Sequence, residues 1–499
     1  MRRFALPGAV LLALAAVLAV AWGTRPGASG ATVDAGQGAA VTSITRSCPP
    51  SAPGSSTARI SMVALPSQAA AGSGAAASAG VATFSAVLAA PASGTGKTST
   101  SADVKAKGAQ PVTVSTPGAV TNVTAPGDAG TAVAATGKMA EGFEAEQSDS
   151  SGTGLVSCTH PGSDMWFVGT GQAAGASQVW LYLMNTGNLT ASADVTILTD
   201  TGQQNGLSSA ITIAPDQSVA ENIAPYVRGS QALALHVQTN TGQVGASVWE
   251  GNGSGGAWLP QANAPATSLV IPGLTVASSA AKLFVVVPGS TDAQLKVVAY
   301  TPSGAVTQFP RSPVDASAGA ATPLALNSLG ASASGLKLTS KQPVVAGVLV
   351  PGSGIGSFTT AVPPVTEQGV VAGNPATRGV TVGLLLTAPS AAARATISVI
   401  GADGSVTTPA GDPSVAVAAG HTLALAVTRP SAGSRQPFAI VVTPQHGSGP
   451  LYAVRVVTSG TGGLSAPLTS LLPVSSAETS IMLPPAQDSY TAVLPAANS

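Results

Sequence analysis

At 499 residues the chain is longer than one ordinary domain, and three to five domains are expected. Only 8% of the residues are charged and the formal net charge is zero. This balance excludes nucleic-acid binding through a basic surface, because that binding depends on clustered positive charge. Aromatic residues make up only 4%, so the cores must be built from Val, Leu, Ile and Ala. That composition favours many short-stranded units over one large core.

The first residues have the pattern of an export signal. Arg2 and Arg3 precede an uncharged run over residues 4–22, which ends in a small-x-small pattern typical of a cleavage site. The run is also just long enough to span a bilayer. We expect residues 1–23 to be a cleaved signal peptide, with an uncleaved N-terminal membrane anchor as the alternative. The protein is therefore predicted to be secreted or extracytoplasmic in the cell envelope, with membrane contact only through this segment if it is uncleaved.

The two cysteines fit an exported protein. Cys48 and Cys158 are the only cysteines in the chain, and export favours their oxidation. We predict a disulfide between them, with two separate buried thiols as the alternative. The bridge would close a loop of about 110 residues, which the loop-entropy model values at roughly 4–5 kcal/mol.

One pattern of two β-strands joined by a polar turn recurs along the chain. The matching segments are residues 179–202, 281–304 and 380–404. Their closing glycines, Gly202, Gly304 and Gly404, lie about one hundred residues apart. A fixed period of this kind indicates an internal repeat, and the repeat sets the architecture.

The repeat predicts how the chain is divided. We expect a flexible linker (24–46), a degenerate first β repeat (47–150), a tryptophan-rich second repeat (151–270), a third (271–370), a fourth (371–475) and closing strands with a tail (476–499). Seven or eight short strands per repeat, separated by Gly, Pro and Asp turns, predict an all-β chain of tandem Ig-like β-sandwiches. A chain that ends on the opening strands of a repeat can also close a circle, so a β-propeller-like ring is the alternative.

No catalytic motif stands out. Residues 94–98 read Gly-Thr-Gly-Lys-Thr, like the end of a phosphate-binding loop, but Pro91 replaces its first glycine and no apolar helix follows. A low-complexity linker is favoured there. The four histidines, His160, His236, His421 and His446, show no metal-ligand spacing. We therefore expect no enzyme activity, no metal and no cofactor, and a hydrolase with a dispersed Ser/His/Asp site is the weakest hypothesis.

The densest charge on the chain is acidic. Glu141, Glu144, Glu146 and Asp149 lie within nine residues of one another. Carboxylates at this density can hold a calcium ion, since calcium takes oxygen ligands from a single loop. A solvated edge or linker is the favoured interpretation.

Four of the tryptophans fall in the second repeat. Trp180 and Trp249 lie inside predicted strands and are expected to fill a core, whereas Trp166 and Trp258 flank strands. Exposed tryptophan faces bind sugars and are enriched in protein interfaces. If an aromatic surface binds a partner, we expect Trp166 and Trp258 to form it, side by side and exposed.

The second repeat also resembles a known family. It carries Met-Trp-Phe-Val-Gly-Thr-Gly at 165–171, Trp-Leu-Tyr-Leu-Met-Asn-Thr-Gly at 180–187 and Asp-Val-Thr-Ile at 194–197. This pattern is similar to a family of exported actinobacterial proteins known only as a domain of unknown function. The resemblance covers roughly residues 45–495. It implies secretion or envelope attachment and an all-β repeat, and it implies no catalytic residues.

The leading hypothesis for function is a non-catalytic cell-envelope protein whose tandem β-domains act as spacer, scaffold or interaction surface. The alternative is a module that binds cell-wall glycan or peptide through the aromatic repeat. Expected partners are accordingly a cell-wall glycan or another envelope protein, and no nucleic acid.

Overall fold

The computed structural model describes residues 38–482 except 66–78, 90–110, 150–153, 206, 208–209, 276–279, 307–312, 327–333, 353, 410–413, 431–434 and 464–466. The expected signal segment (1–23) and the phosphate-loop-like residues 94–98 lie outside the described residues. Within them the chain is all-β, as predicted, with short 3-10 turns at Gly137–Met139, Gln172–Ala174 and Ala224–Val227. These residues include no helix that could cross a membrane.

Eight strands form the first repeat. They are β2 (Ser43–Cys48), β3 (Thr57–Val63), β4 (Ala82–Ala89), β5 (Val112–Val114), β6 (Thr121–Pro126), β7 (Gly130–Thr136), β8 (Glu144–Ser148) and β9 (Leu155–Ser157). One sheet has the order β5-β4-β7-β2 and the other β6-β3-β8-β9. The range expected as linker, 24–46, therefore ends in strand, and β9 extends the first repeat past its expected boundary at 150.

The second repeat contains the strands with the clearest sequence pattern. They are β10 (Asp164–Thr170), β11 (Gln178–Asn185), β12 (Ala191–Thr199), β13 (Gly202–Gln204), β14 (Ile211–Ile213), β15 (Gln217–Asn222), β16 (Ala232–Thr241), β17 (Gly245–Asn252), β18 (Gly255–Leu259) and β19 (Gln261–Ala262). The sheets have the orders β13-β12-β16-β10-β19 and β18-β17-β11-β15, with β14 paired to β12. The chain crosses repeatedly between the two sheets, which is the connectivity of a β-sandwich.

The third and fourth repeats follow the same plan. The third has β20 (Ala266–Leu274), β21 (Lys282–Val287), β22 (Ala293–Thr301), β23 (Gly304–Val306), β24 (Val314–Ala316), β25 (Ala320–Ala325), β26 (Ser334–Val350) and β27 (Ser357–Thr360). The fourth has β28 (Gly369–Asn374), β29 (Val380–Ala388), β30 (Ala393–Ile400), β31 (Val406–Thr407), β32 (Ser414–Val417), β33 (His421–Val427), β34 (Phe438–Pro444), β35 (Tyr452–Ser459), β36 (Leu468–Pro473) and β37 (Ser475–Ser476). The long strand β26 serves both sheets of its repeat, pairing with β20 and β22 at one end and with β21 and β27 at the other. The prediction of sandwich repeats is thus confirmed.

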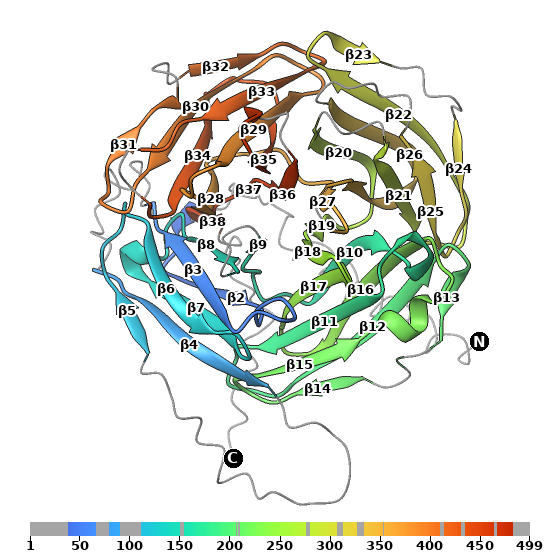
Figure 1. Ribbon diagram of the computed structural model, residues 1–499, viewed down its shortest axis with the longest axis horizontal. Helices are drawn as coiled ribbons and strands as arrows, with labels where there is room; N and C mark the ends of the chain where they lie inside the picture. The colour runs from blue at the N-terminus through green and yellow to red at the C-terminus, as the bar shows by residue number, and fades with distance from the viewer. Residues whose placement is uncertain are drawn as a thin grey trace, which may run out of the picture. The chain divides into compact units, whose positions relative to one another are not determined.

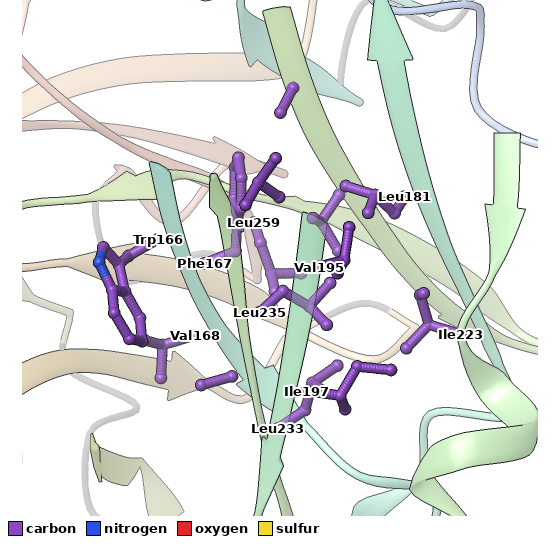
Figure 2. Close-up of a cluster of buried hydrophobic side chains, with 14 of the residues drawn as sticks. Trp166, Phe167, Val168, Leu181, Val195, Ile197, Ile223, Leu233, Leu235 and Leu259 are labelled. Atoms are coloured by element: carbon purple, nitrogen blue, oxygen red, sulfur yellow. The ribbon is translucent and has the colours of Figure 1, made fainter. Parts of the chain in front are cut away.

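Alternating side chains explain why these strands pair face to face. In β11, Leu181 and Leu183 are fully buried between the two sheets of the second repeat, where they meet Leu235 and Ile197 of the opposite sheet. Figure 2 shows this core, with Leu181 and the β12 and β16 side chains pointing toward one another. Small and branched aliphatic residues fill it, as the low aromatic content required.

The sandwiches of residues 40–479, which form one compact unit, are joined in a closed circle. Strand β15 pairs in parallel with β4, which joins the second repeat to the first. Strand β10 packs on β26, and β20 packs on β29 and β35, which joins the second repeat to the third and the third to the fourth. Strand β28 then packs on β8 and β3 of the first repeat, and Figure 1 shows the sheets following one another around this circle.

The last described residues complete the closure. Ser475–Ser476 pairs with β28, and the Ala477 N–H donates to the Gln368 carbonyl at 2.7 Å. The next two residues turn to the first repeat, where the Glu478 carbonyl accepts from the Gly142 N–H at 2.9 Å. Residues 480–482 belong to a second compact unit, in which β38 (Ser480–Met482) pairs with β1 (Gly38–Ala40) in a two-stranded sheet.

Candidate functional site

The acidic segment of the first repeat is buried rather than solvated. Glu144 pairs with Arg46 at 2.9 Å, and their side chains are 13% and 5% exposed. Glu146 pairs with Arg455 of the fourth repeat at 2.6 Å, and both side chains are at most 2% exposed. The expectation of a solvated edge was wrong for these two residues, because each carboxylate faces a buried guanidinium. Nowhere in the described ranges do three or more His, Cys, Asp or Glu residues gather to hold a metal ion.

A cavity of about 300 Å³ lies where the four repeats meet. Its lining comes from the first repeat (Arg46, Glu144 and 155–160), the second (Phe167, 246–247 and 258–263), the third (Val362 and Pro363) and the fourth with its closing segment (Val370, 471–473, 475–476 and Glu478). Strands β9, β18, β19, β36 and β37, which carry many of these residues, lie toward the inside of the circle in Figure 1. The volume is at the lower end of the range for small-molecule sites.

One side of the cavity is charged. Arg46, Glu144, His160 and Glu478 line it. Burial raises the pKa of Glu144, Arg46 lowers it through its charge and hydrogen bond, Glu478 raises it further and His160 lowers it. The His160 Nδ1 lies 2.7 Å from the Pro161 carbonyl and must donate to it, so Nε2 of the neutral ring is the acceptor. Two carboxylates therefore share this corner with one guanidinium and one imidazole.

The rest of the lining is largely apolar and carries one orphan hydroxyl. Its apolar residues include Phe167, Trp258, Leu259 and Leu472. The Ser247 hydroxyl also lines the cavity, is buried and has no hydrogen-bond partner among the described residues. Buried polar atoms are normally paired, so this hydroxyl marks a place where a ligand or water can bind.

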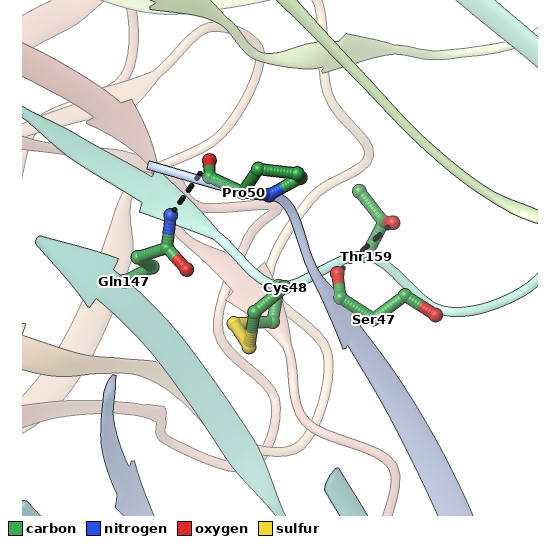
Figure 3. Close-up of a disulfide and its surroundings, with 6 residues drawn as sticks. Ser47, Cys48, Pro50, Gln147 and Thr159 are labelled. Atoms are coloured by element: carbon green, nitrogen blue, oxygen red, sulfur yellow. Dashed lines mark hydrogen bonds between the residues drawn. A yellow bond between two sulfur atoms is a disulfide. The ribbon is translucent and has the colours of Figure 1, made fainter. Parts of the chain in front are cut away.

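The disulfide fixes the charged corner. Cys48 and Cys158 are bonded, as predicted, and are 110 residues apart. Beside them the backbones of Ser47 and Thr159 exchange two hydrogen bonds, at 2.8 and 2.9 Å. Figure 3 shows these two residues next to the disulfide. Arg46 lies just before Ser47 in one of the two bridged segments, and His160 follows Thr159 in the other. The disulfide therefore holds both residues at the cavity.

The structure does not bring the two predicted tryptophans together. Trp166 is 4% exposed in β10 and stacks on His236, with ring centroids 3.8 Å apart. Trp258 is 7% exposed in β18, lines the cavity and lies 5.8 Å from Tyr182. The expected exposed pair was wrong as geometry, since cross-strand packing buries both rings. A binding role for either residue stays a prediction.

The other histidines lie apart from the cavity. His236 Nε2 lies 3.0 Å from Asp164, and burial lowers the pKa of His236 although the Asp164 interaction opposes this. His421 Nδ1 lies 2.8 Å from the Ala419 carbonyl, and His446 is exposed. Only His160 therefore shares a cavity with carboxylates and serines.

A further buried carboxyl lies inside the second repeat and does not line the cavity. Glu250 accepts hydrogen bonds from the backbone N–H of Thr170 at 2.9 Å and from its hydroxyl at 2.7 Å. Burial raises the pKa of Glu250 to about 8, against the opposing effect of the Thr170 hydrogen bonds. Gly169 makes room for the carboxyl, because a Cβ there would lie 2.1 Å from the Glu250 Oε1.

We expect Glu250→Gln to remove a pH dependence of stability. Between the ordinary pKa of 4.5 and the folded value of about 8, the folded state keeps a proton that the unfolded state releases. Stability therefore falls as the pH rises, by on the order of 3 kcal/mol between pH 5 and 8. Urea unfolding at pH 5, 6.5 and 8 measures this, with the exposed Asp315→Asn as the control variant. A glutamine variant that still follows the parent slope contradicts the assignment.

Sequence reasoning missed most of the cavity. Arg46 and Glu478 are isolated charges in the sequence, and Glu144 was placed in a solvated cluster. A usable signal existed only outside the cavity, at Arg455, the partner of Glu146. In the three strands that align there, Ala246-Ser-Val248, Ala346-Gly-Val348 and Ala453-Val-Arg455, an arginine stands where the other repeats bury valine. Such a break in a repeated core pattern indicates a buried partner charge.

Comparison with known proteins gives a family and little else. The model of a family described as "Family of unknown function (DUF5719)" matches residues 112–428, more than half of the chain. This confirms the resemblance to a family of unknown function. No curated protein matches. A solved structure, Streptomyces avermitilis alpha-L-rhamnosidase complexed with L-rhamnose, is 10% identical over 85% of this chain and 55% of that chain, so the match spans about half of its length. Its TM-score is 0.10, so it carries no argument about this chain.

Proposed function

We propose that this chain, which belongs to the Family of unknown function (DUF5719), is an exported, non-catalytic binding protein of the cell envelope. In this proposal the four sandwiches are a rigid scaffold around one ligand cavity. The disulfide supports an extracytoplasmic location, because such bridges persist in oxidising compartments. The observation that carries the proposal is the cavity itself, since its lining is contributed by all four repeats.

The charges of the cavity indicate the class of ligand. Glu144 and Glu478 outnumber the guanidinium of Arg46, and the Arg46–Glu144 ion pair leaves Glu478, which is exposed, to meet a cation. Phe167 and Trp258 add an apolar surface to the lining. A short peptide with an amino group at the end of an aliphatic side chain satisfies both the charges and the apolar lining. We therefore propose an amine-bearing peptide as the ligand.

Calorimetric titration with two matched peptides tests this function. N-acetyl-alanyl-lysine amide carries a side-chain ammonium, and N-acetyl-alanyl-norleucine amide lacks it. We expect the lysine peptide to bind about tenfold more tightly, which corresponds to the ~1.4 kcal/mol of one partly desolvated charge contact. Glu478→Gln should remove the preference, and Asp315→Asn, on the surface of the third repeat, should keep it. The proposal fails if the two peptides bind equally tightly, and it also fails if neither peptide binds.

A hydrolase is the second candidate, favoured by one observation. His160 shares the cavity with Glu144, Glu478 and two serines of the closing segment, Ser475 and Ser476. In the described ranges no hydrogen bond joins His160 to a serine, and its Nδ1 is engaged by Pro161. Mass spectrometry of the titrated lysine peptide separates the two candidates. Cleavage products that vanish in His160→Ala would replace binding by hydrolysis as the function.

A further inference from the structure

The second repeat carries an aromatic row that reaches the cavity only at Trp258. Trp180 of β11 pairs across the sheet with Trp249 of β17, which pairs in turn with Trp258 of β18. Tyr182 stands two residues from Trp180, on the same face of β11 and about 7 Å along the strand. The Trp249 ring packs closely against Gly256, where a Cβ would come within 2.1 Å of it. The row is therefore packed and rigid.

A groove runs along the end of this row. Trp180 and Tyr182 line a hollow of about 550 Å³ together with Gln178, Asn222 and Pro53. Tyr182 and Pro53 also line a second hollow of about 550 Å³, which continues between the 50–56 loop and Asp128 of the first repeat. Because both hollows are lined by Tyr182 and Pro53, they adjoin there, and we take the two together as one candidate groove. We call it the Trp180 groove.

The groove offers aromatic rings and hydrogen-bonding groups that are neutral except for Asp128 in the second hollow. Trp180 is half-buried, whereas Gln178 and Asn222 are exposed at the rim. The Asn222 Oδ1 accepts from the Ala224 N–H at 3.1 Å, and its side-chain amide can still donate. In the second hollow, the Ser51 hydroxyl is buried and has no partner among the described residues. The orphan hydroxyl and the aromatic rings are therefore groups that a bound ligand could contact.

We propose that the Trp180 groove binds a neutral polysaccharide chain. The apolar C–H face of a sugar ring stacks on an aromatic ring, and its hydroxyls both donate and accept, as the amides of Gln178 and Asn222 do. The first hollow is lined by no charged residue, which matches an uncharged chain and not an acidic one. A proline-rich peptide is the poorer fit, because its backbone offers mostly acceptors while the rim offers both kinds of group.

The site is particular to the second repeat. Leu183 pairs with Ala246 as Val285 pairs with Ala346, so these strands align and Lys282 takes the position of Trp180 in the third repeat. Leu349 likewise replaces Trp249. Every tryptophan of the sequence except Trp22 lies in the second repeat, and we infer a single polysaccharide segment bound at this groove.

Tryptophan fluorescence and calorimetry on the full chain test the groove. The probes are N-acetylglucosamine tetramer, cellotetraose and a proline decamer. We expect at least one tetrasaccharide to bind and to perturb the fluorescence, with at least a tenfold loss of affinity in Trp180→Ala. Gln178→Ala, at an exposed position that does not endanger folding, should weaken binding three- to tenfold. Tyr452→Ala, a half-buried aromatic of the fourth repeat, is the matched control and should bind as the parent does.

The outcomes separate this groove from the central cavity. Glu478→Gln should leave tetrasaccharide binding unchanged, so failure of the peptide proposal leaves this one standing. Binding of the proline decamer in place of the sugars, lost in Trp180→Ala, overturns the polysaccharide in favour of a peptide. Absence of binding by every probe at millimolar concentration, or binding that survives both groove variants, overturns the site.

Discussion

Replacing Glu146 by leucine is expected to lower the free energy of unfolding by about 3–5 kcal/mol, because the fully buried Arg455 then has no counter-charge. The carboxylate joins the two ends of the circle. It accepts from Arg455 Nη1 at 2.6 Å and from the Gly373 N–H of β28 at 2.9 Å. Gly373 sits at a register shift in β28 and has no side chain to block Glu146. Chemical unfolding followed by fluorescence measures the loss.

A double variant distinguishes the charge from the packing. Glu146→Leu with Arg455→Val removes both charges and gives the fourth repeat the valine that the second and third have at this core position. We expect it to recover most of the lost stability, since Nε and Nη2 of Arg455 are buried without partners among the described residues. Asp315→Leu is the surface control. A loss below about 1 kcal/mol in Glu146→Leu is the result expected of an exposed ion pair. It would contradict a buried Glu146–Arg455 pair that joins the first and fourth repeats.

Replacing both cysteines by alanine is expected to cost about 4–5 kcal/mol. The bridge closes a loop of 110 residues, and long loops gain most from closure in the entropy model. Cys48 and Cys158 lie in the core of the first repeat, so the alanine pair also loses some packing. Thermal and chemical unfolding of the parent and the variant give the difference.

Reduction provides the control for the disulfide. Adding a thiol reductant to the parent should bring its stability close to that of the alanine pair, while the variant should not respond. The reduced protein should also bind the lysine peptide more weakly, because Arg46 and His160 lose the joint that holds them at the cavity. If the parent and the variant unfold with equal free energy, the other contacts of the first repeat hold the two ends of the loop together. The disulfide then adds no stability.

Much of the scaffold was predictable because its signals are local or repeated. The two strands predicted within residues 179–202 are present as β11 and β12, and the glycine period indicated the repeat length. The disulfide followed from having only two cysteines in an exported chain. Closure was foreseen only as an alternative, since Thr479 and its neighbours resemble an opening strand whether or not a circle forms.

The sites were not predictable because they are assembled from distant residues. Arg46, Glu144 and Glu478 meet at the cavity although Glu478 is more than 300 residues from the other two. Trp180 was assigned to a core because a strand interior usually is one, but its face of the sheet borders the groove between two repeats. Trp166 was expected at a surface and is covered by His236. In each case the packing of neighbouring sheets decides exposure, and no local pattern encodes it.

The closed circle also restricts how this protein can evolve. An open string of sandwiches can gain or lose a unit at either end, because each unit contacts only its neighbours. Here the first and fourth repeats are joined by the Glu146–Arg455 pair and by the backbone of Glu478. Adding a fifth repeat would separate the Glu146–Arg455 pair. It would also require a different angle between neighbouring repeats at every junction of the circle. New specificity must therefore arise within the existing repeats, through loops and groove residues such as Trp180, while their number stays fixed.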